Sequence, residues 1–282
     1  MREKRALLLW LVLFLSPSRL RSQEIYYNEL PVDIVEARLK RAEPKNDARE
    51  QALKQLFDEA DCRGEHFIEQ PVKGSRLPNV ICELPGAGEF VVVVGAHFDK
   101  VNEGEGVVDN WSGASLLPTL YQSLRAKPRQ LTFRFIGFTD EEKGMFGSNF
   151  YVRQLTAEER VKIVAMVNID SLGLSSTKVW VTRSDKKLMA SLLQVSNALN
   201  VPVAGVNVEQ VGDSDSHAFA SKKIPVIDFH SLTQNTLPIL HSRNDNLAAV
   251  QWKEYYDSYR LLAAYLAFLD ETLPAADTPT QK

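Results

Sequence analysis

The chain has 282 residues, of which 44% are hydrophobic and 24% are charged, and its formal net charge is −3. These values are typical of a soluble globular protein, and they exclude an intrinsically disordered chain, a collagen-like chain and a protein with many membrane spans. The length suits one α/β domain with a substantial core, because single α/β domains commonly reach roughly 250 residues.

The first residues have the pattern of a signal peptide. A basic start, MREKR, runs into the apolar stretch ALLLWLVLFL, and small and polar residues follow up to Ser22. The apolar stretch is about half of the roughly 20 residues that a spanning helix needs, so no stable membrane span is expected. We therefore expect a signal peptide over residues 1–22, a single domain over 23–273 and a mobile tail over 274–282, in a secreted or periplasmic protein.

The charge of the processed chain bears on its partners. Loss of residues 1–22 would leave 28 basic and 35 acidic residues, a formal charge of −7. Because this balance repels a phosphate backbone, no nucleic-acid partner is expected.

The remaining pattern predicts a three-layer α/β/α fold. Residues 32–60 have the spacing of two amphipathic helices broken near Pro44, which we interpret as a packing cap. Strand-like segments follow at 64–72, 79–84, 90–96, 131–138, 164–169, 178–183 and 225–232, and helical patterns lie at 112–126, 147–155, 186–200 and 251–273. Strands that alternate with helices indicate a mostly parallel, mixed central sheet covered on both sides.

The two cysteines, Cys62 and Cys82, each lie beside a strand-like segment. In an oxidising compartment they would pair, so we expect a disulfide between neighbouring strands. The alternative is two buried free thiols.

Polar residues follow three of the apolar strands. His97 and Asp99 follow the segment 90–96, Glu141 and Glu142 follow 131–138, and Asp170 follows 164–169. Ligands of such sheets bind beyond the carboxyl ends of the strands. Carboxylates and imidazoles that meet there are costly to desolvate unless a cation compensates their charge.

Two loop residues, Asp109 and His241, complete a mixed nitrogen and oxygen donor set. Such a set suits Zn²⁺, and less well Mn²⁺ or Co²⁺. Taken singly, Asp109 could cap the helix that begins near Ser112, and Asp215 could cap a helix after it. The set as a whole favours a metal site, whereas the remaining histidines are interpreted as structural: His66, His217 and His230.

Six segments together resemble the co-catalytic zinc aminopeptidases of peptidase family M28. In order and spacing these are GAHFDKV, GVVDNWSGAS, FTDEEKGMFGS, VNIDSLG, SDSHAF with KIPVIDFHS, and LHSRND, and the match covers roughly residues 65–270. The resemblance implies two zinc ions, one on His97 and Asp170 and one on Glu142 and His241, with Asp109 bridging them. It also implies a cis peptide bond after Asp109.

The same resemblance implies how the residues would act. Glu141 would be the general base for hydrolysis of peptide bonds at the N-terminus of peptide substrates, and Asp99 would orient the ring of His97. Spacing alone does not distinguish the roles of Glu141 and Glu142. Loops around residues 215–219 and 231–240 are candidates for the substrate pocket, so Asp215 and Phe219 are predicted to bind substrate.

Two other functions fit this family. The first is a glutaminyl cyclase, a single-zinc acyltransferase that forms N-terminal pyroglutamate. The short segment EEKGMFGS and the Leu240 that precedes His241 count against it. The second is a metal-free binding module, and the filled ligand and base positions count against that. The sequence predicts no oligomeric state.

Overall fold

The structure, a computed structural model, describes residues 26–210 and 212–276. The predicted signal peptide lies outside the described residues, and so do residues 277–282 of the predicted tail. The last helix continues to Ala276, so the first three residues of that predicted tail are helical. In the described ranges, none of the helices combines the length and the apolar character that crossing a bilayer requires.

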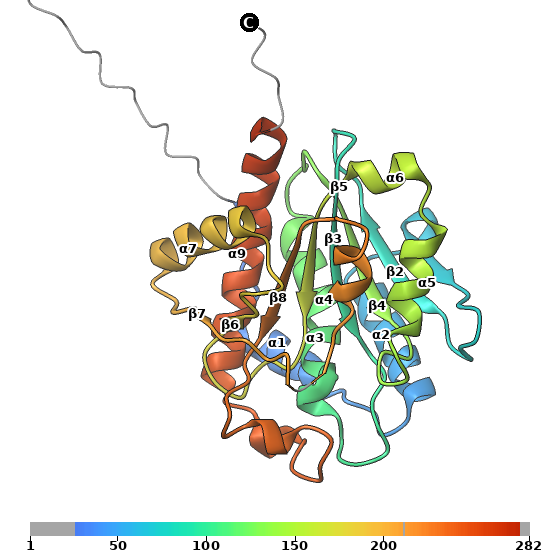
Figure 1. Cartoon of the computed structure of the whole chain (residues 1–282), viewed down its shortest axis with the longest axis vertical. Coiled ribbons are helices and arrows are strands. Elements are labelled where there is room, and N and C mark those ends of the chain that lie inside the picture. Colours follow the sequence, from blue (N-terminus) through green and yellow to red (C-terminus); the bar gives the residue numbers. More distant parts are fainter. Residues whose placement is uncertain (1–25, 211, 277–282) are drawn as a thin grey trace, which may run out of the picture.

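One eight-stranded mixed sheet forms the centre of the described chain (Figure 1). Its order is β1-β2-β4-β3-β5-β8-β6-β7, and four of the seven strand pairings are parallel. The strands are β1 (Phe67–Gln70), β2 (Asn79–Leu84), β3 (Val91–His97), β4 (Thr132–Phe138), β5 (Ile163–Ile169), β6 (Lys178–Val179), β7 (Ala204–Gly205) and β8 (Val226–His230).

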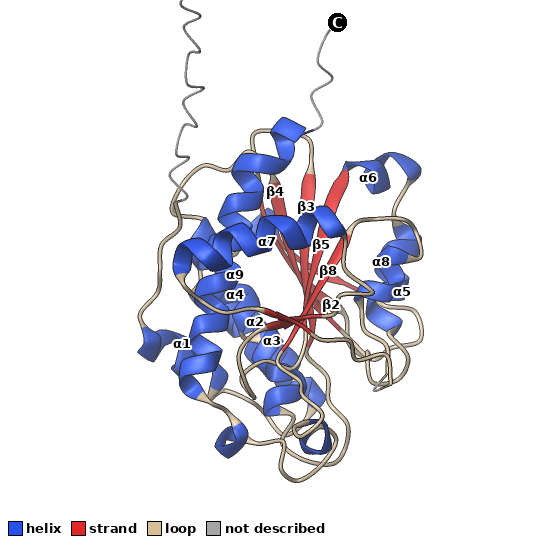
Figure 2. Ribbon diagram, turned by 60° about the vertical axis from the view of Figure 1, so that its left-hand side comes forward, coloured by secondary structure: helices blue, strands red, loops and turns tan. Residues whose placement is uncertain are grey.

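Helices cover both faces of this sheet, as the sequence predicts (Figure 2). One layer contains α1 (Val32–Leu39), α2 (Asn46–Glu59), α3 (Ser112–Ala114), α4 (Leu116–Leu124), α7 (Lys186–Leu199) and α9 (Trp252–Ala276). The other contains α5 (Phe146–Gln154), α6 (Ala157–Lys162) and α8 (Ser216–Ala220). The three-layer α/β/α prediction is therefore confirmed.

The continuous apolar runs are explained by burial on both faces of the sheet. In β3, Val92 and Val94 belong to the core on the α4 and α9 side, whereas Val93 belongs to the core on the α5 and α8 side. Because successive side chains of a strand point to opposite faces, a strand buried on both sides must be apolar throughout. β3 is therefore a rigid central strand, and it carries a polar residue only at its end.

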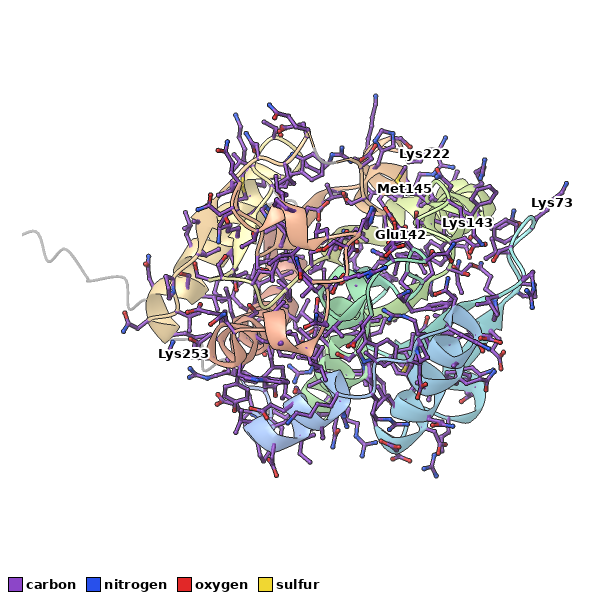
Figure 3. All side chains as sticks on the ribbon, turned by 90° about the horizontal axis from the view of Figure 1, so that it is seen from below. Lys73, Glu142, Lys143, Met145, Lys222 and Lys253 are labelled. Atoms are coloured by element: carbon purple, nitrogen blue, oxygen red, sulfur yellow. A yellow bond between two sulfur atoms is a disulfide. The ribbon has the colours of Figure 1, made fainter. Side chains whose placement is uncertain are left out.

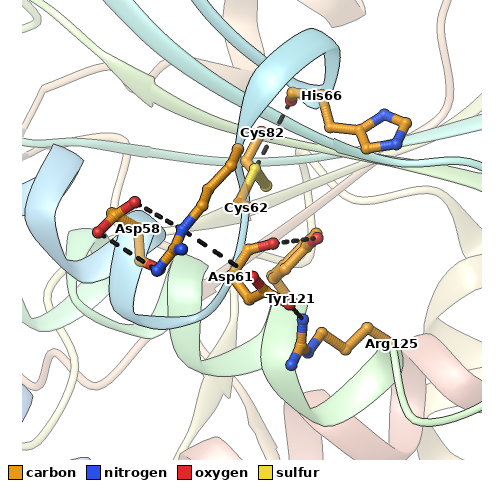
Figure 4. The surroundings of a disulfide bond; sticks show 8 residues. Asp58, Asp61, Cys62, His66, Cys82, Tyr121 and Arg125 are labelled. Atoms are coloured by element: carbon orange, nitrogen blue, oxygen red, sulfur yellow. Dashed lines mark hydrogen bonds and ion pairs between the residues drawn. A yellow bond between two sulfur atoms is a disulfide. The ribbon is translucent and has the colours of Figure 1, made fainter.

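The predicted pairing of Cys62 with Cys82 is present, but it joins the loop after α2 to β2 and does not join two strands (Figure 4). Near it, Arg125, which directly follows α4, pairs with Asp61 at a distance of 2.6 Å. The C-terminal end of α2 is thus tied covalently to the sheet and by an ion pair to the neighbouring helix.

Three segments differ from the prediction, and one of them is the short strand β7, which was not predicted. The predicted strand 178–183 keeps strand pairing only over β6, because the Ser184 amide donates to the Trp180 carbonyl and closes a turn. Helix α6 was not predicted, although Thr156 and Glu159 form a reciprocal cap at its start. That spacing of Thr and Glu is a recognised helix start, so the sequence did contain the signal.

Candidate metal centre

Three parallel strands bring the predicted polar residues to one edge of the sheet. His97 is the last residue of β3, which lies between β4 and β5. Glu141 and Glu142 follow the end of β4, and Asp170 directly follows β5. Figure 3 looks onto this edge, with Glu142 near the middle of the face.

The five predicted ligands form two groups that share Asp109. His97 Nε2 lies 3.3 Å from Asp109 Oδ1 and 3.6 Å from Asp170 Oδ1. His241 Nε2 lies 3.1 Å from Asp109 Oδ2 and 3.0 Å from Glu142 Oε2. Each oxygen of the Asp109 carboxylate therefore faces a different histidine, and each group adds one further carboxylate.

Asp109 is held in a short turn (Val107–Trp111) by groups from two distant segments. Asp245 accepts hydrogen bonds from the backbone amides of Val108 (2.7 Å) and Asp109 (3.2 Å). The side-chain amide of the next residue, Asn110, donates to the Ile169 carbonyl at the end of β5 (2.8 Å). The Asp109–Asn110 peptide bond is cis, as the family resemblance predicts. Sequence reasoning did not single out Asp245, although it lies four residues after His241.

Asp99 contacts more groups than the sequence indicates. The ring Nδ1 of His97 lies 3.1 Å from the main-chain carbonyl of Asp99 and 3.6 Å from its carboxylate. The same carboxylate accepts hydrogen bonds from the backbone amides of Glu141 (3.0 Å) and Glu142 (3.3 Å). Asp99 therefore links the end of β3 to the segment that follows β4.

The burial of so many carboxyl groups perturbs their protonation. Burial raises the pKa of Glu141 to about 10 and that of Glu142 to about 7. Burial alone would also raise the pKa of Asp109, but hydrogen bonds from His241 and His97 hold it below its ordinary value. The hydrogen bond to Asp109 raises the pKa of His241 to about 9.

These residues fit a bound cation. One donor atom each of His97, Asp109 and Glu142 lies within 4.8 Å of the others. Glu142 Oε1 is buried and has no hydrogen-bond partner among the described residues. A buried carboxylate oxygen without a partner is costly, and a cation would satisfy it. Two imidazoles with three carboxylates form a donor set that suits zinc.

A cavity of about 380 Å³ opens beside the five ligands and Glu141. Its apolar wall consists of Met145, Trp180, Val208, Leu232, Leu237 and Leu240. The last three belong to the predicted pocket loop 231–240. Sequence reasoning missed Trp180 as a wall residue, because it placed Trp180 within a strand.

The two predicted substrate-binding residues, Asp215 and Phe219, do not line the cavity. Phe219 is fully buried and packs against Phe138 and Tyr151, with ring centroids 6.1 and 5.8 Å apart. Asp215 is also buried and makes no side-chain cap on α8. Phe219 fills the core because it lies on the inner side of α8, and a one-dimensional pattern does not show this.

Left-handed backbone conformations concentrate around the site. Seven non-glycine residues in the described chain have a positive φ, and four of these lie at the site: Asp140 (52°), Met145 (57°), Ser171 (61°) and His241 (55°). Residues in this region carry steric strain and persist only where the surroundings hold them.

The sequence matches the model of a known family, and it matches several known proteins over part of their length. A sequence model described as Peptidase family M28 matches residues 79–266. Leupeptin-inactivating enzyme 1 of Streptomyces exfoliatus is 33% identical over 151 residues, which are 52% of this chain and 34% of that protein. The chain thus spans about a third or less of the length of the first curated relatives that it matches.

Solved structures share the fold. The LapA aminopeptidase of Legionella pneumophila has a TM-score of 0.74 at 18% identity, covering 86% of this chain and 72% of that one. BSAP, a zinc aminopeptidase from Bacillus subtilis, has a TM-score of 0.61 at 24% identity, covering 67% and 49%. A glutaminyl cyclase of an Acidobacteriales bacterium has a TM-score of 0.69 at 18% identity, covering 85% and 93%.

Proposed function

Because the chain belongs to peptidase family M28, we propose that it is a zinc-dependent exopeptidase that removes amino acids from the N-terminus of peptides. One observation carries the proposal: the two oxygens of the Asp109 carboxylate face His97 and His241 separately, at 3.3 and 3.1 Å. This is the arrangement that a carboxylate needs in order to bridge two ions. The aminopeptidase names of similar proteins support the same reaction.

In this proposal each ion has ligands from three segments of the chain. His97, Asp109 and Asp170 would hold one ion, and Asp109, Glu142 and His241 would hold the other. A bound pair of zinc ions would lower the pKa of a water molecule at the centre and would polarise the scissile carbonyl.

Glu141 is proposed as the general base. It lines the cavity beside the ligands, and the Asp99 carboxylate holds its backbone amide. Two cations beside Glu141 would lower the pKa that burial raises. The ionised carboxylate would then take a proton from the attacking water and return it to the leaving amine. The ammonium group of the substrate would lie near the carboxylates of the centre, and the first side chain of the peptide would lie against the apolar wall. This placement would favour substrates with a free N-terminus.

The test separates the base from the ligands. Glu141→Gln keeps the size of the side chain but removes its basicity, so zinc content should stay at two per chain while turnover of an aminoacyl p-nitroanilide falls roughly 10²- to 10⁴-fold. Glu142→Gln should instead lower the zinc content. Glu158→Gln, on the exposed surface of α6, is the matched control and should change neither. Normal turnover by the Glu141→Gln protein would refute the assignment.

Glutaminyl cyclisation is the competing reaction on this fold, as the likeness to a cyclase indicates. Incubation with a peptide that begins with glutamine distinguishes the two. Release of the first residue supports the peptidase, and loss of ammonia with retention of the residue supports the cyclase. Metal analysis adds a second criterion, because the peptidase should hold two zinc ions and the cyclase one.

We further propose that the protein is exported. The N-terminal pattern of residues 1–22 and the disulfide between Cys62 and Cys82 both support an oxidising compartment. N-terminal sequencing of the mature protein would test this, and an intact N-terminus in the cytosolic fraction would contradict it.

A further inference from the structure

Arg49 of α2 lies outside the family-matched region, yet it is fully buried. The amphipathic pattern assigns α2 to packing, a role that needs only apolar side chains. A guanidinium is costly to bury unless its donors are satisfied. The contacts of Arg49 therefore indicate what this residue does at that position.

Its hydrogen-bond acceptors are main-chain carbonyl oxygens. Nε donates to Phe98, Nη2 donates to Gly106 at 2.9 Å, and Nη1 donates to Glu105 at 3.2 Å and to Glu43 at 3.4 Å. The guanidinium also lies 5.2 Å from the ring centroid of Trp111. These contacts satisfy the buried charge without a direct carboxylate partner among the residues that the structure describes.

Three of the four carbonyls, those of Phe98, Glu105 and Gly106, belong to the two ends of one loop at the metal centre. Phe98 directly follows His97, and Glu105 and Gly106 shortly precede Asp109. One turn before Arg49, the side chain of Asn46 completes the contact. It accepts from the backbone amide of Lys100 at 3.1 Å and donates to the carbonyl of the same residue at 3.2 Å. The first turn of α2 thus holds loop 98–106 at three places.

Only arginine suits this position. Burial lowers the pKa of Arg49 to about 10, while Asp99, Asp245 and Asp109 nearby favour the charged form, so it stays charged at neutral pH. Lysine would keep the charge, but its single nitrogen cannot reach both ends of the loop as a planar fork does.

We propose that Arg49 is a positioning residue of the metal centre, which holds His97 and Asp109 at the separation that two bound ions require. The inference rests on the proposed function, since it assumes that these residues are ligands. Arg49 acts through the main chain of loop 98–106 and touches neither substrate nor ion.

The experiment compares Arg49→Lys with a matched control, Arg129→Lys. Arg129 is also buried and donates to two carbonyls, those of Leu124 (2.8 Å) and Tyr26 (3.1 Å), but it lies just before the start of β4, at the opposite end of the sheet. Metal-free proteins are titrated with Zn²⁺ against a competing chelator, and the visible absorption of the Co²⁺ forms is recorded. Arg49→Lys should weaken at least one ion roughly 10- to 100-fold and change the Co²⁺ spectrum. Arg129→Lys should bind both ions as wild type does.

Asn46→Ala is the second variant, because a half-buried position at the start of α2 tolerates truncation. It should weaken Zn²⁺ binding in the same direction, and it decides the question if Arg49→Lys does not fold. Wild-type affinity for both ions and an unchanged Co²⁺ spectrum, in each variant that folds, would overturn the proposal. A wild-type protein that binds no zinc would instead refute the proposed function.

Discussion

Removal of the Cys62–Cys82 disulfide should lower stability by an amount that follows from its position. The bridge joins residues 20 positions apart. In the chain-entropy description, a closed loop of this length stabilises the folded state by about 3 kcal/mol. A domain of this size loses roughly 2 to 4 °C of Tm per kcal/mol, so the expected fall is roughly 6 to 12 °C.

Urea unfolding of the metal-free protein measures the change in the free energy of unfolding, and thermal unfolding measures the change in Tm. The double variant Cys62→Ala with Cys82→Ala removes two buried sulfur atoms as well as the cross-link, so cavities add to its loss. Wild-type protein can instead be reduced in urea and refolded in the presence of a reductant, which keeps the thiols free. This protein retains both sulfur atoms, so its loss of stability measures the effect of the cross-link alone. If the reduced protein were as stable as the oxidised one, the entropic reasoning would be refuted.

Three further predictions concern the site and its surroundings. Burial lowers the pKa of His230 from 6.5 to about 4, so protonation favours the unfolded chain, and the free energy of unfolding should fall by about 3 kcal/mol from about pH 7 to about pH 4. His230→Asn should remove that part of the fall in urea titrations, and an unchanged slope would contradict it. Asp245→Asn replaces one of the two acceptors that hold Val108 and Asp109 with a donor, so Zn²⁺ affinity should drop at least about 10-fold in a chelator competition; equal affinity would exclude this role. Dialysis against 1,10-phenanthroline should abolish peptide hydrolysis and added Zn²⁺ should restore it, whereas activity that survives chelation would argue against a metallopeptidase.

The clustering of the proposed metal ligands could be predicted because sheet topology does most of the positioning. His97 ends β3 and Asp170 follows β5, and parallel neighbours end at the same edge. The polar residue after each apolar run was therefore a strong signal. The position of Asp109 was not predictable in this way, because it depends on a loop fixed by Asp245 and Arg49.

The remaining differences arise from contacts that are distant in sequence. Arg49 and Phe219 both occur in helical patterns. Those patterns do not show that Arg49 contacts loop 98–106 or that Phe219 packs in the core. The predicted strand after Lys178 has suitable β-formers, but a local turn overrides their propensity. Local patterns thus gave the elements, and tertiary contacts decided which side chains face the centre.

The left-handed residues around the centre bear on any selection for heat resistance. Glycine adopts such backbone angles without steric cost, so Ser171→Gly would relieve strain of about 1 kcal/mol. It would also remove the hydrogen bond from the Ser171 hydroxyl to Asp170 (3.2 Å) and raise the entropy of the unfolded chain. The same change would increase the backbone mobility next to Asp170 at elevated temperature. Relief of strain and loss of this contact oppose each other, so the proposed activity, more than thermal stability, should decide which residue is retained at position 171.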